Sequence, residues 1–274
     1  MKRSLLAAAL LTVITVSLAG CAAGGTGSDA IPGKGSGTDD SLAAVQEAGT
    51  LTVGTEGTYR PFSFHAGGAG KLTGYDVDVI EAVADKLGVD AKFEETQWDA
   101  IFAGLEAGRF DVIANQVSIT PERVAEYEFS TPYTYSTGVI VVKKDNTSIT
   151  SFDSLSGKST AQSLTSNWYT LAKDSGAQIQ SVEGWAQSVA LVEQGRVDAT
   201  INDNLTFLDY KKQTGAPGVK VAATTTGERS ESAFAFAQGS TTLATAVDKA
   251  LAELTESGEL AEISKKYFGD DVSK

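Results

Sequence analysis

Apolar and polar positions follow two regular spacings over much of the chain. Apolar side chains recur every three or four positions over 76–87 and stop at Gly88, which predicts a helix that ends at a glycine. Short apolar runs at 51–55, 89–93 and 110–114 predict strands, with helices between them. Because helices and strands alternate, the pattern favours an α/β fold with mostly parallel strands.

Two stretches of the chain echo each other. Residues 98–115 read WDAIFAGLEAGRFDVIAN and residues 185–202 read WAQSVALVEQGRVDATIN, and each predicts a helix, a glycine stop and a buried strand. Such units can also converge independently, but we interpret the echo as two similar lobes. Ligands bind beyond the carboxyl ends of strands in α/β sheets, so a small-molecule site is expected where the two strand ends meet. The identical positions are Trp98/Trp185, Ala103/Ala190, Glu106/Glu193, Gly108/Gly195, Arg109/Arg196, Asp111/Asp198 and Asn115/Asn202.

The first twenty residues have the pattern of an export signal. Lys2 and Arg3 precede an apolar run over 5–18, which is shorter than the roughly 18 or more apolar residues of a spanning helix. The run ends in Leu-Ala-Gly-Cys, which resembles the bacterial lipobox, so Cys21 is expected to carry a lipid; an ordinary signal peptide is the alternative. We therefore interpret 1–20 as a lipoprotein signal peptide and the glycine-rich 21–40 as a flexible tether.

The composition excludes several kinds of function. Acidic residues outnumber basic ones by 35 to 22, and the resulting formal charge of −13 argues against nucleic-acid binding. A single cysteine and a single histidine cannot supply a structural zinc site or an intrachain disulfide. No cofactor or metal is expected, and the chain is expected to be a monomer.

Arg123 and Asp203 are the candidates for binding a charged ligand. Thr120 and Pro121 predict a helix start, which places Arg123 in the first turn, where a cation opposes the helix dipole. A carboxylate bound by the guanidinium and the Ser118 hydroxyl would compensate; the alternative is pairing with a nearby surface glutamate. Asp203 ends a strand, where it could bind an ammonium group or cap the next helix. An α-amino acid carries both of these groups.

Other candidates follow the predicted strands. Glu56 comes after the first strand and could bind an ammonium or amide group. Tyr59 and Trp98 could sandwich the apolar part of a ligand, although aromatic side chains more commonly pack in a core. A polar cluster before a helix could donate hydrogen bonds to a carboxylate or could simply cap that helix, and it comprises Thr165, Ser166 and Asn167.

Several segments together resemble the bacterial extracellular solute-binding proteins of family 3, which serve ABC importers of polar amino acids. The resemblance covers about 44–272 and is carried by GTEGTYRPFSF, GKLTGYDVDV, TQWDAIFAGLEAGRFDVIANQVSITPER, EFSTPYTYS and KKYFG. It implies a two-lobe, type II periplasmic-binding-protein-like fold with the ligand in the interlobe cleft. Hinge strands would cross near 133–137 and 229–233, with lobe 1 at 41–134 plus 233–274 and lobe 2 at 135–232.

The resemblance also implies roles for single residues. Arg123 matches the arginine that clamps the α-carboxylate, Ser118 matches a hydroxyl beside it, and Asp203 matches the aspartate that binds the α-ammonium. Gln116 stands where relatives often have glycine, so its backbone carbonyl would serve the ammonium. The loop in the second lobe lacks the Gly-Thr pattern of many relatives. The remaining implied contacts come from Glu56, Tyr59, Trp98, Ser166 and Asn167.

The phrases GTEGTY, ANQVSIT, AQSLTSNW and TINDNLTFLDYKK most resemble the cystine-binding branch of the family. The resemblance therefore implies an extracytoplasmic, lipid-anchored protein that binds L-cystine, closes by a hinge and delivers it to permease subunits without catalysis. The alternative is an enzyme on the same fold, a dehydratase of a prephenate- or arogenate-like acid with Glu56 as general acid.

Overall fold

The computed structural model describes residues 39–227 and 229–274, and Asp39–Lys274 form one compact unit. The predicted signal peptide, Cys21 and nearly all of the predicted tether lie outside the described residues. Among the helices in the described ranges, none is long and apolar enough to cross a membrane.

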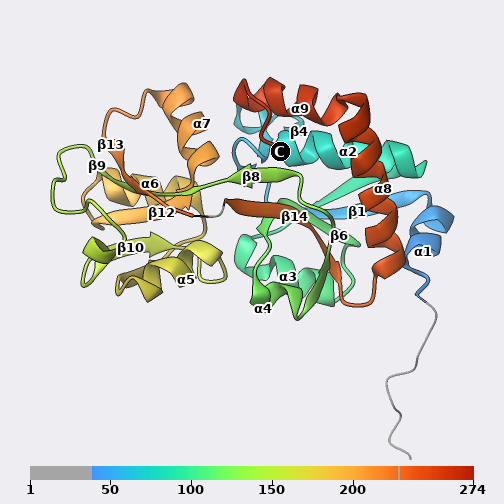
Figure 1. The fold of residues 1–274 in the computed structure, drawn as a ribbon, viewed down its shortest axis with the longest axis horizontal. Helices are drawn as coiled ribbons and strands as arrows, with labels where there is room; N and C mark the ends of the chain where they lie inside the picture. Colours follow the sequence, from blue (N-terminus) through green and yellow to red (C-terminus); the bar gives the residue numbers. More distant parts are fainter. Residues whose placement is uncertain (1–38, 228) are drawn as a thin grey trace, which may run out of the picture. The chain divides into compact units, whose positions relative to one another are not determined.

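The first sheet has the strand order β5-β1-β6-β14-β7, and β8 also pairs with β14 (Figure 1). β1 runs parallel to β5 and β6, whereas β14 runs antiparallel to its partners. Every residue of β6 is buried, as expected for a central strand covered on both faces. The strands are β1 (Thr50–Thr55), β5 (Asp90–Glu95), β6 (Val112–Ser118), β7 (Tyr127–Phe129), β8 (Thr134–Ser136) and β14 (Ser230–Ala237).

Helices cover both faces of this sheet and complete the first lobe. α1, α2, α8 and α9 share a core that includes Ile80 and Leu251, and α3 packs on the opposite face around Ile101 and Ile113. A small three-stranded sheet follows β1. The elements are α1 (Ser41–Ala48), β2 (Thr58–Tyr59), β3 (Ser63–His65), η1 (Ala66–Gly68), β4 (Leu72–Thr73), α2 (Tyr75–Leu87), α3 (Trp98–Glu106), α4 (Pro121–Val124), α8 (Thr241–Ser257) and α9 (Glu259–Phe268).

The second lobe is built on a sheet of order β11-β10-β12-β9-β13. Side chains alternate along β9, so Val141 packs with α6 and α7 while Ile140 packs with α5 on the other face. The elements are β9 (Gly138–Lys143), η2 (Asp153–Leu155), β10 (Ser159–Gln162), α5 (Asn167–Asp174), β11 (Gln178–Ser181), α6 (Trp185–Glu193), β12 (Ala199–Asp203), α7 (Asn204–Thr214) and β13 (Val219–Thr224).

The chain passes twice between the lobes. β8 of the first sheet continues through Thr137 into β9 of the second, and the chain returns from β13 to β14 (Figure 1). This is the two-lobe α/β arrangement that the sequence predicts. The residue boundaries assigned to each lobe stay a prediction.

The sheets are mixed, so the expectation of mostly parallel strands is wrong. Each sheet keeps a parallel part, β5-β1-β6 in one lobe and β11-β10-β12 in the other, but its remaining pairs are antiparallel. The chain crosses between lobes as extended strands, and such crossings lack the helical connection that makes neighbouring strands parallel. The strand predicted at 110–114 begins later, at Val112, because Phe110 packs into the core under α3.

Candidate functional site

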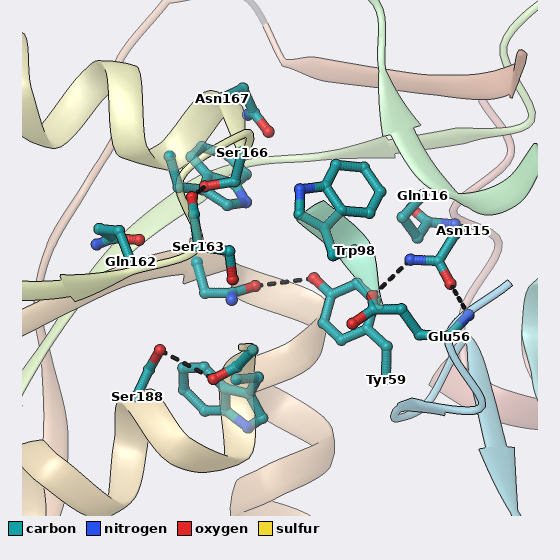
Figure 2. A pocket seen from close by; sticks show the side chains of 14 residues that line it. Glu56, Tyr59, Trp98, Asn115, Gln116, Gln162, Ser163, Ser166, Asn167 and Ser188 are labelled. Carbon is teal, nitrogen blue, oxygen red and sulfur yellow. Dashed lines mark hydrogen bonds between the residues drawn. The ribbon is translucent and has the colours of Figure 1, made fainter. Parts of the chain in front are cut away.

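A cavity lies between the two lobes, next to the ends of β1 and β6 on one side and of β10 and β12 on the other (Figure 2). The echoed strands end here, as the sequence predicts. The cavity measures about 50 Å³, whereas most small-molecule pockets are roughly 300 Å³ or larger. An amino acid would therefore require the lobes or the lining aromatic side chains to move apart. The lining residues are Glu56, Tyr59, Trp98, Asn115, Gln116, Gln162, Ser163, Ser166, Asn167, Trp168, Gly184, Trp185, Ser188 and Asn202.

Direct contacts between the lobes hold the cavity closed. The Tyr59 hydroxyl donates to Oδ1 of Asn202 at 2.9 Å and accepts from the Thr206 hydroxyl at 3.1 Å. Farther out, Nε of Arg60 donates to a carboxylate oxygen of Asp209 at 3.3 Å. Each of these bonds joins a first-lobe residue to a second-lobe residue, so they form only when the lobes are in contact.

Arg123 is a buried cation at the contact between the lobes. Its side chain donates from Nη1 to the Ser118 carbonyl at 2.9 Å and from Nη2 to the Thr165 carbonyl of the other lobe at 3.0 Å. The guanidinium carbon lies 5.5 Å from the ring centre of Trp98 and 5.2 Å from that of Phe102, within cation–π range. Thr120 caps the short helix that carries Arg123, as predicted.

This guanidinium has no carboxylate partner in the part of the chain that the structure describes. Within residues 39–227 and 229–274, no acidic side chain lies within 4.0 Å of Arg123, so the alternative of pairing with a surface glutamate is wrong. Burial lowers the pKa of Arg123 to about 10, because the charged form is desolvated. A buried cation whose hydrogen bonds reach only carbonyl groups is a site that a ligand carboxylate would complete.

Asp203 ends β12 and begins α7. One carboxylate oxygen accepts from the Leu205 backbone N–H at 2.8 Å, so the residue caps the helix, and the other accepts from the Ser136 hydroxyl. Burial raises the pKa of Asp203 to about 6 despite these two bonds. Asp203 therefore caps α7, which is one of the two roles that the sequence predicts for it. It lies beside the cavity, next to Asn202, but is not one of the lining residues.

Glu56 lines the cavity from the end of β1. Its Oε2 accepts from Nδ2 of Asn115 at 2.6 Å, and Oδ1 of Asn115 accepts in turn from the Glu56 backbone N–H at 2.9 Å (Figure 2). Burial, with a smaller contribution from the nearby charges of Asp99 and Glu183, raises the pKa of Glu56 to about 7, although the hydrogen bond from Asn115 opposes this shift. An ammonium group in the cavity would favour the ionised carboxylate.

Gln116 adopts the left-handed conformation, with φ of 51°. Asp76 fixes it there by accepting from the Gln116 backbone N–H at 2.8 Å and from its Nε2 at 2.6 Å, while Tyr133 donates to the same carboxylate at 3.0 Å. Glycine adopts this φ without strain, which explains why it would suit the position. Burial raises the pKa of Asp76 to about 7. The GYDVDV segment contains Asp76, but the sequence analysis did not single it out.

Most of the predicted site residues line the cavity. Ser166 both lines it and caps α5 by accepting from the Tyr169 backbone N–H at 3.0 Å, so its capping alternative is also realised. The structure brings Arg123 and Thr165 together at the lobe contact. The predicted residues that line the cavity are Glu56, Tyr59, Trp98, Gln116, Ser166 and Asn167, and those that do not are Ser118, Arg123, Thr165 and Asp203.

Several lining residues were missed as candidates. The echo could have identified three of them. Trp185 is the echo partner of the candidate Trp98, and the echo pair Asn115 and Asn202 directly precedes the candidates Gln116 and Asp203. Neither Gln162 nor Ser188 is an identical position of the echo. Gln162 ends a strand and Ser188 lies within a helix of ordinary sequence, so the sequence pattern does not distinguish them from other polar residues.

Asp99, near the start of α3, accepts hydrogen bonds from Thr165 of the second lobe. Its Oδ1 accepts from the Thr165 backbone N–H at 3.1 Å and from the Thr165 hydroxyl at 2.8 Å. Arg123 donates to the backbone carbonyl of the same residue. Two first-lobe side chains therefore bind Thr165, one at its N–H and hydroxyl and the other at its carbonyl. These contacts stabilise closure without touching the cavity.

We expect Asp99→Ala to weaken the binding of every ligand that has a single ammonium group by a similar factor of about 3–10, because it removes a closure contact worth about 1 kcal/mol. Isothermal titration with several amino acids measures this. Lys92→Ala, at an exposed residue away from the lobe contact, is the control. A change in the ranking of ligands would contradict a role limited to closure.

Two α/β lobes that are joined by crossing strands and close over a polar cavity define a hinged ligand-binding protein. The chain belongs to the bacterial extracellular solute-binding proteins, family 3, which it matches over residues 51–270. It is 49% identical, over the full length of both chains, to the L-cystine-binding protein TcyA of Bacillus subtilis. The prediction of a binding protein and not an enzyme is thereby confirmed, as is the type II fold.

Two solved structures inform the lobe arrangement. The unliganded open L-cystine solute receptor of Neisseria gonorrhoeae is 46% identical, with a TM-score of 0.58 over 87% of this chain and all of that one. An ancestral arginine-binding protein bound to glutamine is only 36% identical, yet its TM-score is 0.76 over 81% of this chain and 99% of that one. The better fit to the less similar, ligand-bound protein agrees with the direct lobe contacts described above.

Proposed function

We propose that this protein is the substrate-binding component of an ABC importer for a polar amino acid, and that its ligand is L-cystine. The observation that carries the amino-acid class is the buried Arg123 guanidinium at the lobe contact, with no carboxylate partner in the described ranges. Arg123 and the Ser118 hydroxyl would bind the α-carboxylate, and Asp203 and the Gln116 carbonyl would bind the α-ammonium. The names of the similar proteins from Bacillus subtilis and Neisseria gonorrhoeae support cystine.

In this proposal the protein works outside the cytoplasm as a monomer, anchored to the membrane by a lipid on Cys21. The extracellular family supports the location, and the lipobox-like sequence before Cys21 supports the anchor. Ligand binding brings the lobes together, and the closed form presents the ligand to the permease subunits.

The test is thermal unfolding of the purified protein, refolded to remove ligand carried over from expression, with cystine and each amino acid added separately. A ligand at a hundred times its dissociation constant stabilises the native state by about 2.7 kcal/mol, which shifts Tm by at least roughly 2–4 °C at this chain length. We expect the largest shift with cystine. A larger shift with another amino acid would replace cystine as the ligand, and no shift with any would reject the proposed class.

A further inference from the structure

Three buried polar atoms on the wall of the cavity have no hydrogen-bond partner in the described parts of the chain. They are Nε1 of Trp98, Oε1 of Gln116 and Nε2 of Gln162. Leaving a buried donor or acceptor unpaired costs roughly 1–3 kcal/mol, so each of these atoms is a candidate contact for a ligand. Trp98 and Gln116 belong to the first lobe, which also carries Arg123, the residue proposed to bind the α-carboxylate. Gln162 belongs to the second lobe and is not explained by that head group.

Gln162 faces a part of the cavity that is suited to an anion. It ends β10 and is only 3% exposed, and it lines the cavity together with Gly184, Trp185 and Ser188 from the start of α6. α6 spans nine residues and has Gly184 at its N-cap, so no side chain caps its first turn. Uncapped N–H groups and the helix dipole favour negative charge at such an end.

Ser188 adds a hydroxyl one turn into the same helix. It donates to the Gly184 carbonyl at 3.0 Å and retains lone pairs that can accept from a protonated group or a water. Rotation about its side-chain torsion would let it donate to a ligand oxygen instead. The amide of Gln162, the Ser188 hydroxyl and the first turn of α6 thus form a group of donors on the second-lobe side of the cavity.

A carboxylate of the first lobe faces this group of donors. A Cβ atom built on Gly184 would lie 3.6 Å from Oε1 of Glu56, so the carboxylate approaches the start of α6 across the cavity. Among the described residues, only Asn115 donates to the Glu56 carboxylate, and it donates to Oε2, so Oε1 is available to accept from a ligand. The other charges near Glu56 are the acidic Asp99 and Glu183, so a cation placed here would be favoured by all three.

We propose that Gln162, Ser188 and the N-terminus of α6 bind a second ligand carboxylate, and that Glu56 binds the ammonium group next to it. This proposal rests on the proposed function, because the first head group is assigned to Arg123 and Asp203. It defines the ligand class as molecules with two α-amino-acid head groups joined by a short chain. Cystine, with a CH₂–S–S–CH₂ linker, belongs to this class.

The two head groups would have different charge environments. The first is bound by a cation and an anion, Arg123 and Asp203, whereas the second has neutral donors for its carboxylate and an anion for its ammonium. A ligand with a single head group would make the first set of contacts and leave Gln162 unpaired. The second site therefore selects against single amino acids by the cost of an unsatisfied buried donor.

The test compares L-cystine with S-methyl-L-cysteine, which has one head group and a similar sulfur atom, by isothermal titration. We expect Gln162→Leu with Ser188→Ala to weaken cystine binding about 10–100-fold, equivalent to about 1.4–2.8 kcal/mol. Binding of S-methyl-L-cysteine should change by no more than about twofold. Gln178→Leu, on the exposed end of the neighbouring strand β11, is the matched control and should change neither affinity.

A second variant distinguishes loss of the second site from a defect in folding. Gln162→Glu keeps the polarity and size of the side chain but places a negative charge next to the ligand carboxylate, so it should also weaken cystine binding and spare S-methyl-L-cysteine. An equal loss for both ligands, or no loss for cystine in either variant, would overturn the second site while leaving the proposed function intact. A wild-type protein that binds neither ligand would reject the proposed function and this site with it.

Discussion

Arg123→Met is expected to abolish amino-acid binding and to leave the ligand-free protein as stable as the wild type, or more stable. The guanidinium is buried against Trp98 and Phe102 and donates to two backbone carbonyls, and no carboxylate of the described residues offsets its desolvation. Replacing a buried charge by an apolar side chain of similar length is often neutral or stabilising. Removing the charge from a bound α-carboxylate costs about 3–5 kcal/mol, which is at least a hundredfold in affinity.

Two measurements check this prediction. Thermal unfolding without ligand should give a Tm equal to or above that of the wild type, and titration with cystine should give no heat. Arg109→Met, at an exposed position in the turn after α3, is the matched control and should keep full affinity. A variant that unfolds at a much lower temperature would show that Arg123 holds the lobe contact together, and retained affinity would remove Arg123 from the ligand site.

The second large effect is an expected loss of stability as the pH rises from about 4 to about 8 in the ligand-free protein. Burial raises the pKa of Glu56 to about 7, of Asp76 to about 7 and of Asp203 to about 6, above the roughly 4 expected for unfolded carboxyl groups. The folded protein therefore binds more protons than the unfolded chain across this range, so the free energy of unfolding falls as these protons are lost. Each unit of pKa shift corresponds to about 1.4 kcal/mol.

The carboxyl groups whose pKa values are lowered, which include Asp39, Glu94 and Glu122, change their contribution to stability mainly at the acidic end of this range or below it. Hydrogen bonds lower the pKa of Asp271 to about 2, so its contribution varies mainly below about pH 4. The pKa of His65 is raised by its bond to Glu95, so its stabilisation also declines as the pH rises. A bound ammonium should reverse the trend for Glu56 and Asp203, so ligand affinity is expected to increase between about pH 5.5 and 8.

Denaturant titration at a series of pH values, with and without ligand, measures both trends. Asp76→Asn should flatten the pH dependence of the ligand-free protein, because it removes the most buried of the three carboxyl groups. Asp90→Asn, an exposed residue at the start of β5, should leave that dependence unchanged. A stability maximum near pH 8 in the ligand-free wild type would contradict the prediction.

Local patterns in the chain identified the elements and the place of the site. The apolar spacing over 76–87 predicts α2, and the echo between 98–115 and 185–202 predicts that β6 and β12 end opposite each other. Both are consequences of short-range rules, namely the 3.6-residue period of a helix and the position of ligands at the ends of strands. The same echo includes Trp98, Trp185, Asn115 and Asn202, which all line the cavity.

The α/β class, the two related lobes and the family resemblance, which the match over residues 51–270 confirms, could all be predicted from patterns in the sequence. The mixed sheets that the crossing strands produce, the lack of a counter-ion for Arg123 in the described ranges, and the position of Gln162 in the same cavity as the start of α6 are visible only in the folded chain. Pairing and burial join residues that are far apart in the chain, and the free-energy cost of an unpaired buried group depends on those distant neighbours and not on local spacing.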